Sequence, residues 1–595
     1  MMNARIRLLS SVALVGLVAH SRADLKDISF IAEPLFKGKQ VMEGRQPMAY
    51  ILQNSGEGTN ASISISSPEG LPITIPVSLP KGAEKTILGE GAAGYQQQTV
   101  LTTDFGRIEL PENNNVAYGN RAILQIGGRQ DDLGFLASQG DLAFIDLYAD
   151  PKLLPTRSTD YDRIQTIVLA EGAELMNDQA ASALLRAVMG GRHLLILGGA
   201  SAPILSDKRF APLVVSGQVR PVAVAGIRSK GTFAASGPIT ISAGTFLGKP
   251  LWSDGSNTIL SHNSFGLGTI YVLAFDITDG PGRTYPGRGT IIRATLLPTP
   301  SQERNYYGPE RPQGVMLTAE SILGGISSNQ GMFQVSPPSM RNVALTLGAY
   351  LLIVLPLNFW ILGKLKRPQL AWLTIPIVSA AFSGVVFSFA AGLYKQDLQT
   401  ATSAFIVGDA RSNSILVAGR QQVFVPQGGN IPLKIEGLED LRTARDESDY
   451  YSFSGRSRDE GQTVSLVDTG NLIATANARN LSFHDNEFVQ TLTTGPLINA
   501  SLKRVGDRWR GTLQNTSNYT LSSVRLRADD NPSSDANIPT LAPGQSASIS
   551  GKVTPETLTA GFLVLADVDG AFGAQVGRKL SQRVQLAYRI QGDRN

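Results

Sequence analysis

Two long apolar runs stand out in the middle of the chain. Residues 343–363 contain no charged residue, and neither do residues 370–394. Each run is long enough to cross about 30 Å of hydrocarbon as an α-helix. Two consecutive runs of this length disfavour the alternative, a buried helical pair in a soluble core. We therefore expect a two-helix transmembrane hairpin over 343–394, with the lipid bilayer as a partner.

The charges beside these runs predict their orientation. The connecting segment KLKRPQ carries Lys364, Lys366 and Arg367, whereas each outer flank holds one nearby basic residue. The positive-inside rule places this tip in the cytoplasm and both large flanking regions outside it. Because no charge interrupts either run, the hairpin is typical of an anchor rather than of a transport pathway.

The N-terminus has the pattern of a secretory signal. Arg5 and Arg7 precede an uncharged run from Leu8 to Ala19, which is too short to span a bilayer. Small residues flank Arg22 in the segment Ser21–Ala23, so we expect cleavage after residue 23. Arg22 keeps an uncleaved anchor open as the alternative. Together with the hairpin, this predicts a protein of the cytoplasmic (inner) membrane whose large regions are periplasmic.

Period-two alternation dominates both ends of the mature chain. Strands expected at 48–53, 61–66 and 73–77 are separated by Asn, Gly and Pro clusters, as in a β-sandwich. A late segment repeats this plan: LQN ending at Asn54 is echoed by LQN ending at Asn515, and each precedes a β run and a Pro-Gly-type turn. We therefore expect two Ig-like sandwiches. Trp509 and Tyr519 either pack in the second core or form an aromatic platform for a glycan.

Between residues 118 and 300 the period changes to that of an α/β domain. Thr166–Ala170 and His193–Leu197 read as buried strands, and an amphipathic helix between them begins after the N-cap Asn177 and ends at Gly190-Gly191. This βαβ unit implies a parallel sheet with helices on its faces. The predicted fold class is therefore multi-domain α/β plus all-β.

A family resemblance rests on these residues. The run DRIQTIVLAEGAELMNDQAASALLRAVMGGRHLLILGGA resembles the middle of a class I glutamine-amidotransferase-like, flavodoxin-like domain, and FGLGTIYVLAFDITDGP is similar to a late strand of such domains. The whole layout resembles uncharacterised bacterial membrane-anchored proteins in which this domain is degenerate and β-sandwich modules flank it. The divisions that follow are signal peptide 1–23, β-sandwich 24–117, α/β domain 118–300, linker 301–342, hairpin 343–394, β-rich domain 395–490 and Ig-like sandwich 491–595.

The turn after the second buried strand is the first place to look for chemistry. It reads Gly198-Gly199-Ala200-Ser201, without the cysteine that amidotransferases place there, so the resemblance does not imply glutamine hydrolysis. A serine hydrolase would need Ser201, with His262 as base and Asp276 or Asp254 as the orienting acid. The turn lacks the Gly-x-Ser-x-Gly elbow. Backbone N–H groups of residues 198–200 form a weak candidate site for a phosphate or sugar.

Composition excludes several other functions. The chain has no cysteine and four histidines, and scattered carboxylates such as Asp131-Asp132 have no Ca²⁺-loop spacing, so we expect no metal and no cofactor. A net charge of +4 over 595 residues without a basic tract gives no support for nucleic-acid binding. The sequence predicts a non-enzymatic binding or scaffolding protein of the envelope, with a protein or glycan partner. The alternative is the serine hydrolase.

Overall fold

The computed structural model describes most of the chain between Ser21 and Gln591. Ser201, Ala200 and most of the predicted signal peptide and linker lie outside the described residues. The segments outside the description are 1–20, 26, 39, 42–44, 67–70, 93–97, 111–115, 118–120, 131, 137–143, 200–201, 228–237, 279, 286–287, 289–339, 395–397, 444–462, 481, 507, 529–530, 553–560, 570–577 and 592–595.

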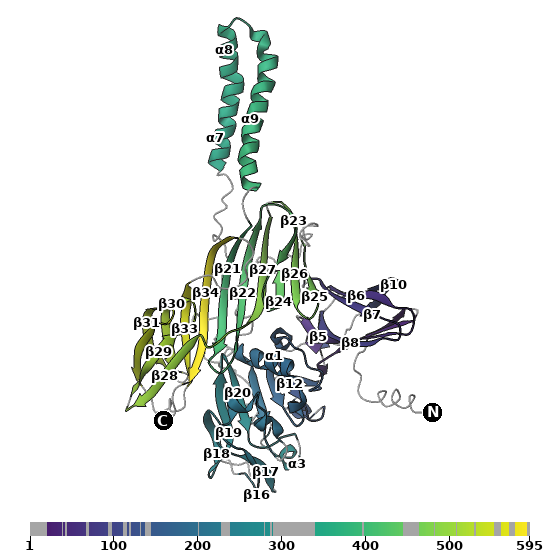
Figure 1. The fold of residues 1–595 in the computed structure, drawn as a ribbon, viewed down its shortest axis with the longest axis vertical. Helices are drawn as coiled ribbons and strands as arrows, with labels where there is room; N and C mark the ends of the chain where they lie inside the picture. Colours follow the sequence, from purple (N-terminus) through teal and green to yellow (C-terminus); the bar gives the residue numbers. More distant parts are fainter. Residues whose placement is uncertain are drawn as a thin grey trace.

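The protein is mostly β: strands hold 55 % of the described residues, and several sheets make up one body from which a helical hairpin projects (Figure 1). The first sandwich pairs a four-stranded sheet with part of a seven-stranded one. The four-stranded sheet has the order β1 (Ser21–Leu25), β2 (Ile28–Pro34), β5 (Arg45–Asn54), β8 (Glu84–Ala92). Alternate residues such as Phe30, Tyr50 and Ile63 are fully buried between the sheets, which is the period-two pattern that the sequence predicted.

The seven-stranded sheet joins segments from both sides of the hairpin. β7 pairs in parallel with β25 at two positions, Ile73 with Leu466 and Thr74 with Val467. The sheet therefore continues from the first sandwich into the region after the hairpin. Its order is β10 (Gly106–Leu110), β9 (Gln98–Thr103), β6 (Thr59–Ser66), β7 (Ile73–Leu79), β25 (Thr463–Asp468), β26 (Leu472–Ala478), β23 (Gly429–Leu433).

The predicted βαβ unit is confirmed. Helix α1 (Asp178–Met189) connects parallel strands β14 and β15, and its N-cap Asn177 accepts a 2.7 Å hydrogen bond from the Ala180 N–H. In chain order the five parallel strands are β12 (Arg121–Ile126), β13 (Phe144–Ala149), β14 (Ile164–Leu169), β15 (His193–Leu197) and β20 (Gly268–Leu273). Their spatial order is 2-1-3-4-5, the flavodoxin-like order. Antiparallel strands extend both edges: β3 (Lys37–Gly38), β18 (Lys249–Asp254) and β19 (Asn257–Phe265).

The parallel sheet has fewer helices than the sequence predicts. Among the described residues, α1 is the one helix of more than two turns in this domain. A β-sheet from the far end of the chain supplies the missing cover, because Leu416 and Ala418 of β22 (Ser414–Val425) belong to the same buried core as α1. Helix α1 thus packs between two sheets, and a second layer of helices is not needed on that side.

This covering sheet runs through both predicted C-terminal modules. The boundary predicted near residue 490 falls inside β27, and β34 returns from the last module to pair in parallel with β21. The order is β24 (Leu438–Thr443), β27 (Ser482–Thr493), β22 (Ser414–Val425), β21 (Gln399–Asp409), β34 (Arg578–Gln591), β33 (Gly561–Asp569), β30 (Thr520–Ala528), β31 (Asn531–Leu541). A second sheet completes the last sandwich: β28 (Ile498–Val505), β29 (Arg508–Asn515), β32 (Ser546–Lys552).

The predicted repeat is visible in the hydrogen bonds of two buried asparagines. The Asn54 side-chain N–H donates to the Leu79 carbonyl at 2.9 Å, and its side-chain oxygen accepts from the Gly56 N–H. The Asn515 side-chain N–H donates to the Leu541 carbonyl at the same distance. Each asparagine therefore holds the turn of its own sandwich in the same way.

The residues of the predicted hairpin form two antiparallel helical arms. The first consists of α7 (Met340–Leu352), a π-helical turn over Ile353–Leu357 that contains Pro356, and α8 (Asn358–Lys364), and the second is α9 (Ala371–Tyr394). Tyr350 and Ser379 share a 2.8 Å hydrogen bond between the arms. Of the described residues, Ala344–Lys364 is long and apolar enough to span a membrane, so one of the two predicted spans meets this criterion.

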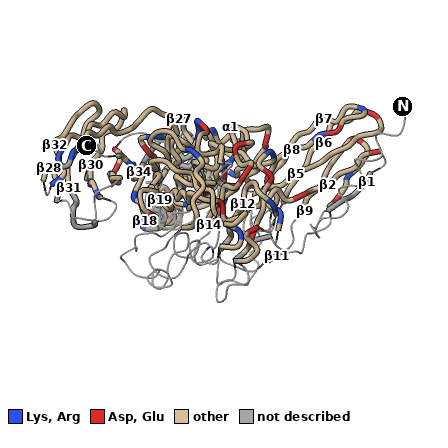
Figure 2. Tube along the Cα trace, turned by 90° about the horizontal axis from the view of Figure 1, so that it is seen from below, with Lys and Arg blue, Asp and Glu red and all other residues tan. Residues whose placement is uncertain are grey.

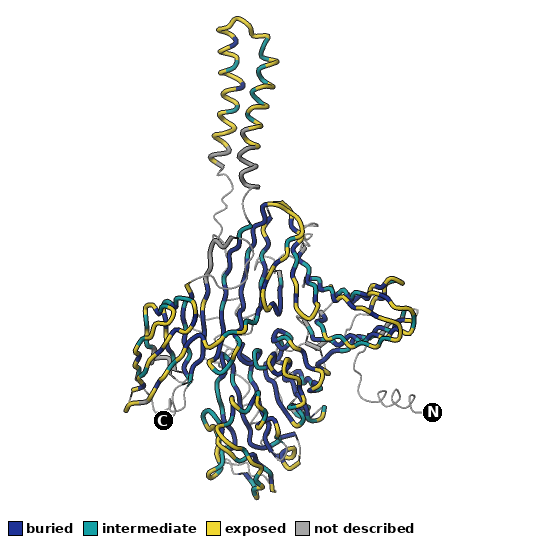
Figure 3. Tube along the Cα trace, viewed as in Figure 1, coloured by how far each residue is buried: buried dark blue, intermediate teal, exposed yellow. Residues whose placement is uncertain are grey.

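The arms expose their apolar surface. In the most apolar part of Ala344–Lys364, 11 % of the residues are buried, whereas a core helix would be mostly buried. Figure 3 shows exposed and intermediate positions along most of the described part of the arms, in contrast to the buried strands of the body. Trp360 and Trp372, near the tip, are 59 % and 74 % exposed. In this structure the helical pair is therefore not enclosed in a core.

Candidate functional site

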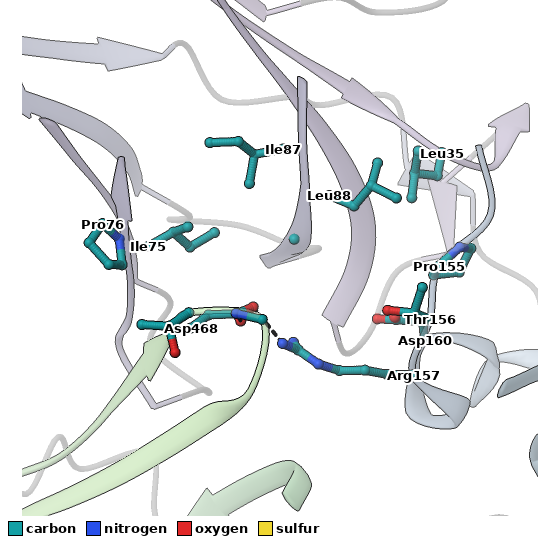
Figure 4. A pocket seen from close by; sticks show the side chains of 13 residues that line it. Leu35, Ile75, Pro76, Ile87, Leu88, Pro155, Thr156, Arg157, Asp160 and Asp468 are labelled. Atoms are coloured by element: carbon teal, nitrogen blue, oxygen red, sulfur yellow. Dashed lines mark hydrogen bonds and ion pairs between the residues drawn. The ribbon is translucent and has the colours of Figure 1, made fainter. Parts of the chain in front are cut away.

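A cavity of about 390 Å³ lies where three regions of the chain meet (Figure 4). The first sandwich contributes Ile75 and Pro76 from β7 and Ile87 to Gly89 from β8. The loop before β14 contributes Pro155 to Arg157 and Asp160, and the turn after β25 contributes Asp468 to Gly470. We call this the junction cavity. Its walls are apolar on the sandwich side and charged on the other.

Arg157 is at the centre of the charged wall. Its guanidinium group forms ion pairs with Glu90 at 3.2 Å and with Asp468 at 2.5 Å, and all three side chains are at most 14 % exposed. Burial by itself would lower the pKa of Arg157, but the two carboxylates outweigh it and raise that pKa. Arg157 therefore stays charged and ties the first sandwich to the region after the hairpin.

A third buried carboxylate, that of Glu439, reinforces the junction. Glu439 of β24 accepts hydrogen bonds from the backbone N–H and the hydroxyl of Ser158. It also accepts from Arg186 at 3.0 Å and from Thr491 at 2.6 Å. Arg186 lies in the last turn of α1, so this carboxylate connects the helix, the loop before β14 and the covering sheet. Figure 2 shows acidic and basic segments interspersed around α1 in the centre of the body.

Among the acidic residues that line the cavity, Asp160 has a shifted pKa. Its low-dielectric surroundings and the nearby Glu90 raise the pKa of its carboxyl well above the ordinary value, against the opposing effect of Arg157. A protonated carboxyl can donate a hydrogen bond, which an ionised one cannot. The thirteen residues that line the junction cavity include no serine, histidine, lysine or cysteine. The hydroxyl side chains in the lining are those of Thr156 and Thr469.

A second hollow lies beside the junction cavity and is lined in part by α1. It has a volume of about 430 Å³ and shares Thr156 and Gly470 with the first. Asp178, Gln179, Ser182 and Arg186 line the rest of it. The two hollows are therefore neighbours, and we refer to them together as the groove.

The residues predicted from the βαβ turn lie at the carboxyl edge of the parallel sheet. Gly199 follows β15, and its N–H donates to the Ser242 hydroxyl at 2.9 Å. Asp276 follows β20, and a Cβ on Gly199 would stand 3.4 Å from the Asp276 Cβ, so the two are adjacent. The Asp276 carboxylate accepts from the N–H and hydroxyl of Thr278. The structure thus brings together Gly198, Gly199 and Asp276.

His262 lies farther back in the same sheet. It pairs with Tyr271, two residues before the end of β20, and its ring packs against that tyrosine at 5.3 Å. Burial, with a smaller effect of His262, lowers the pKa of His193 to about 4. Because Ser201 lies outside the described residues, the Ser201–His262 constellation stays a prediction.

The prediction for Trp509 has a clear outcome. Trp509 is 4 % exposed and packs on Phe562 at 5.3 Å, so core packing is right for this tryptophan. In the part of the chain that is described, no group of three or more His, Cys, Asp or Glu side chains could hold a metal ion. The residues of the junction cavity were missed, because Arg157 stands in a loop with no periodic pattern and its partners are far away in sequence.

Comparisons with known proteins identify no family. No family model matches the chain, and no curated protein matches it significantly. Among solved structures, the yeast delta-COP-I mu-homology domain is 9 % identical and covers 33 % of this chain and 97 % of its own, with a TM-score of 0.19. Exo-β-1,4-mannosidase Op5Man5 from Opitutaceae bacterium strain TAV5 is 11 % identical over 30 % of this chain and 34 % of its own, with a TM-score of 0.21. At these scores neither likeness indicates the fold or the function of this chain.

Proposed function

We propose that this chain is a membrane-anchored, extracytoplasmic protein of the cell envelope that acts by binding or scaffolding. The observation that carries the proposal is the helical hairpin, which projects from a β-rich body and leaves its apolar side chains uncovered. Large exposed apolar surfaces mark contacts with a membrane or a partner. A two-helix hairpin without charges inside its arms fits a lipid bilayer.

The contacts of the body support the same topology. Segments before and after the hairpin share a sheet and the Arg157–Asp468 ion pair. Two arms that leave and re-enter one body are consistent with two spans, because an even number of crossings returns the chain to the same side. At the tip, the Lys364 ammonium lies over the Trp360 ring at 4.1 Å, a pairing suited to a membrane–water interface. With Lys366 and Arg367, this favours a cytoplasmic tip.

The α/β domain is proposed as a degenerate amidotransferase-like module. Its 2-1-3-4-5 strand order agrees with the resemblance, and the chain contains no cysteine to serve as the nucleophile of that family. Its present role would then be structural, since α1 and the loop before β14 form much of the junction. A protein or glycan of the envelope is the expected partner.

Two experiments test the proposal. A reporter that is active only outside the cytoplasm should work when fused at Asn595 and fail when inserted after Lys366; the reverse pattern would overturn the orientation. A serine-directed fluorophosphonate probe should not label the membrane-embedded protein. Labelling that disappears in Ser201→Ala and persists in Ser206→Ala would replace the binding proposal with the serine hydrolase.

A further inference from the structure

Strand β8 borders the junction cavity with an unpaired edge. Among the described strands it pairs with β5 alone, and it stands last in the four-stranded sheet. Three consecutive residues of β8, Ile87, Leu88 and Gly89, line the cavity. Successive side chains of a strand point to opposite faces of the sheet. Because three consecutive residues line the cavity, the backbone edge of β8 borders it, and not only one face of the strand.

The register of β5 and β8 identifies which backbone groups are available. The Asn54 N–H donates to the Ala83 carbonyl at 2.9 Å, so hydrogen-bonded pairs recur at every second position from there. Leu88, opposite Ala49, is a non-hydrogen-bonded position. Its N–H and C=O therefore point away from β5 toward the open edge. Leu88 is also 37 % exposed, which is unusual for a leucine that borders a core.

The chemistry around this edge has two parts. Apolar side chains of Leu35, Ile75, Ile87 and Pro155 line the cavity beside β8. Around the groove the ionised carboxylates outnumber the guanidinium groups by one, because Asp160 has a raised pKa and is not counted. Asp468 and Asp178 line the groove and Glu90 pairs with Arg157 beside it, whereas the bases are Arg157 and Arg186. Asp178 is 75 % exposed and lies at the open end. The groove thus offers an apolar pocket flanked by excess negative charge.

We propose that an extended segment of a partner protein adds to β8 as a fifth strand. Its backbone would bond the open N–H and C=O of Leu88, as in β-strand addition. An apolar side chain would enter the junction cavity, and basic side chains would lie opposite the groove carboxylates. This inference rests on the proposed binding function and names its partner class: an extended peptide that combines apolar and basic residues. A glycan fits less well, because the cavity lining has no aromatic side chain.

The first test measures peptide binding to the full chain in lipid nanodiscs. The probe is a fluorescein-labelled decapeptide that alternates Lys and Val, and the matched control alternates Glu and Val. Fluorescence anisotropy should give at least tenfold tighter binding for the Lys peptide, with an affinity that falls as salt is raised. Equal binding of the two peptides, or binding of neither, would overturn the proposal, as would tighter binding of chitotetraose than of the Lys peptide.

The second test isolates the backbone contact. Leu88→Pro and Leu88→Ala both remove the leucine side chain, but only proline removes the N–H. Proline is tolerated at an edge position whose N–H makes no ladder bond. Leu88→Pro should bind the Lys peptide about tenfold more weakly than Leu88→Ala, the value of one hydrogen bond.

A ligand-side version covers the case in which Leu88→Pro does not fold. Two versions of the Lys peptide are made, one with N-methyl groups on the backbone of its Lys residues and one with them on the backbone of its Val residues. One version should lose binding and the other should keep it, because a strand bonds its neighbour with every second residue. Equal effects of the two sets would contradict strand addition. Failure here leaves the topology and the serine-probe results unchanged, so the proposed function would stand without this site.

Discussion

Arg157 and Asp468 are 311 positions apart in the sequence, yet their side chains form a 2.5 Å ion pair. Arg157 comes from the loop before β14, and Asp468 ends β25 on the other side of the hairpin. The same guanidinium group reaches Glu90 of the first sandwich. One buried arginine thus connects three regions that the hairpin and the linkers separate, and the junction cavity exists because these regions meet there.

Replacing Arg157 should destabilise the junction strongly. Arg157→Ala leaves Glu90 and Asp468 buried without a cation, a change that costs about 3–5 kcal/mol. Arg107→Ala, on the exposed side of β10, is the matched control and should change stability by about 0.5 kcal/mol or less. Urea unfolding of both variants measures this. A similar small effect in the two variants would show that the ion pairs contribute little.

Asp160 should make the junction less stable as pH rises. Its pKa is raised in the folded protein, so the unfolded chain loses this proton at a lower pH than the folded one does. Between the two pKa values the folded state binds more protons, and stability therefore falls with increasing pH. Asp160→Asn removes the loss of stability that comes from deprotonating this carboxyl. The substitution should therefore raise the unfolding midpoint more at pH 7 than at pH 4. The groups that act on Asp160 are Glu90, Arg157, Glu439 and Asp162.

The control for this prediction is Asp569→Asn, which changes an exposed carboxyl at the end of β33. Its unfolding midpoint should follow the pH dependence of the unchanged protein. If Asp160→Asn shows no gain in midpoint at pH 7, Asp160 is ionised in the folded state and cannot act as a hydrogen-bond donor in the cavity.

His193 should act in the opposite direction with pH. Burial lowers its pKa to about 4 from 6.5, so the unfolded chain takes up a proton first as pH falls. Stability should therefore decrease between pH 6.5 and pH 4, by about 3 kcal/mol at most. His193→Leu, which keeps an apolar side chain in the core, should flatten the unfolding midpoint over this range. Burial also lowers the pKa of His484 in β27, so His484→Leu should change the slope in the same direction and is a second test rather than a control. An unchanged slope in His193→Leu would contradict the assignment.

The sequence predicts local features of this fold well and long-range ones poorly. Asn177 caps α1 as expected, since capping depends on residues within one turn. The repeat of Asn54 in Asn515 was also visible, because each turn is encoded within about 30 residues. The pairing of β7 with β25 and the cover of α1 by Leu416 leave no local signature. Arg157 was missed for the same reason, because its role depends on partners that only the tertiary structure brings near.

The two asparagines of the repeat should be equally important, each for its own sandwich. Asn54 and Asn515 are 2 % and 0 % exposed, and alanine at either position leaves buried carbonyl groups, among them those of Leu79 and Leu541, without a donor. Each unsatisfied group costs about 1–3 kcal/mol, so each variant should lose about 3 kcal/mol or more. The exposed Asn60→Ala is the control. Amide hydrogen exchange should show faster exchange in β5–β8 for Asn54→Ala and in β30–β31 for Asn515→Ala. Faster exchange across both sandwiches in either variant would mean that the two unfold as one unit.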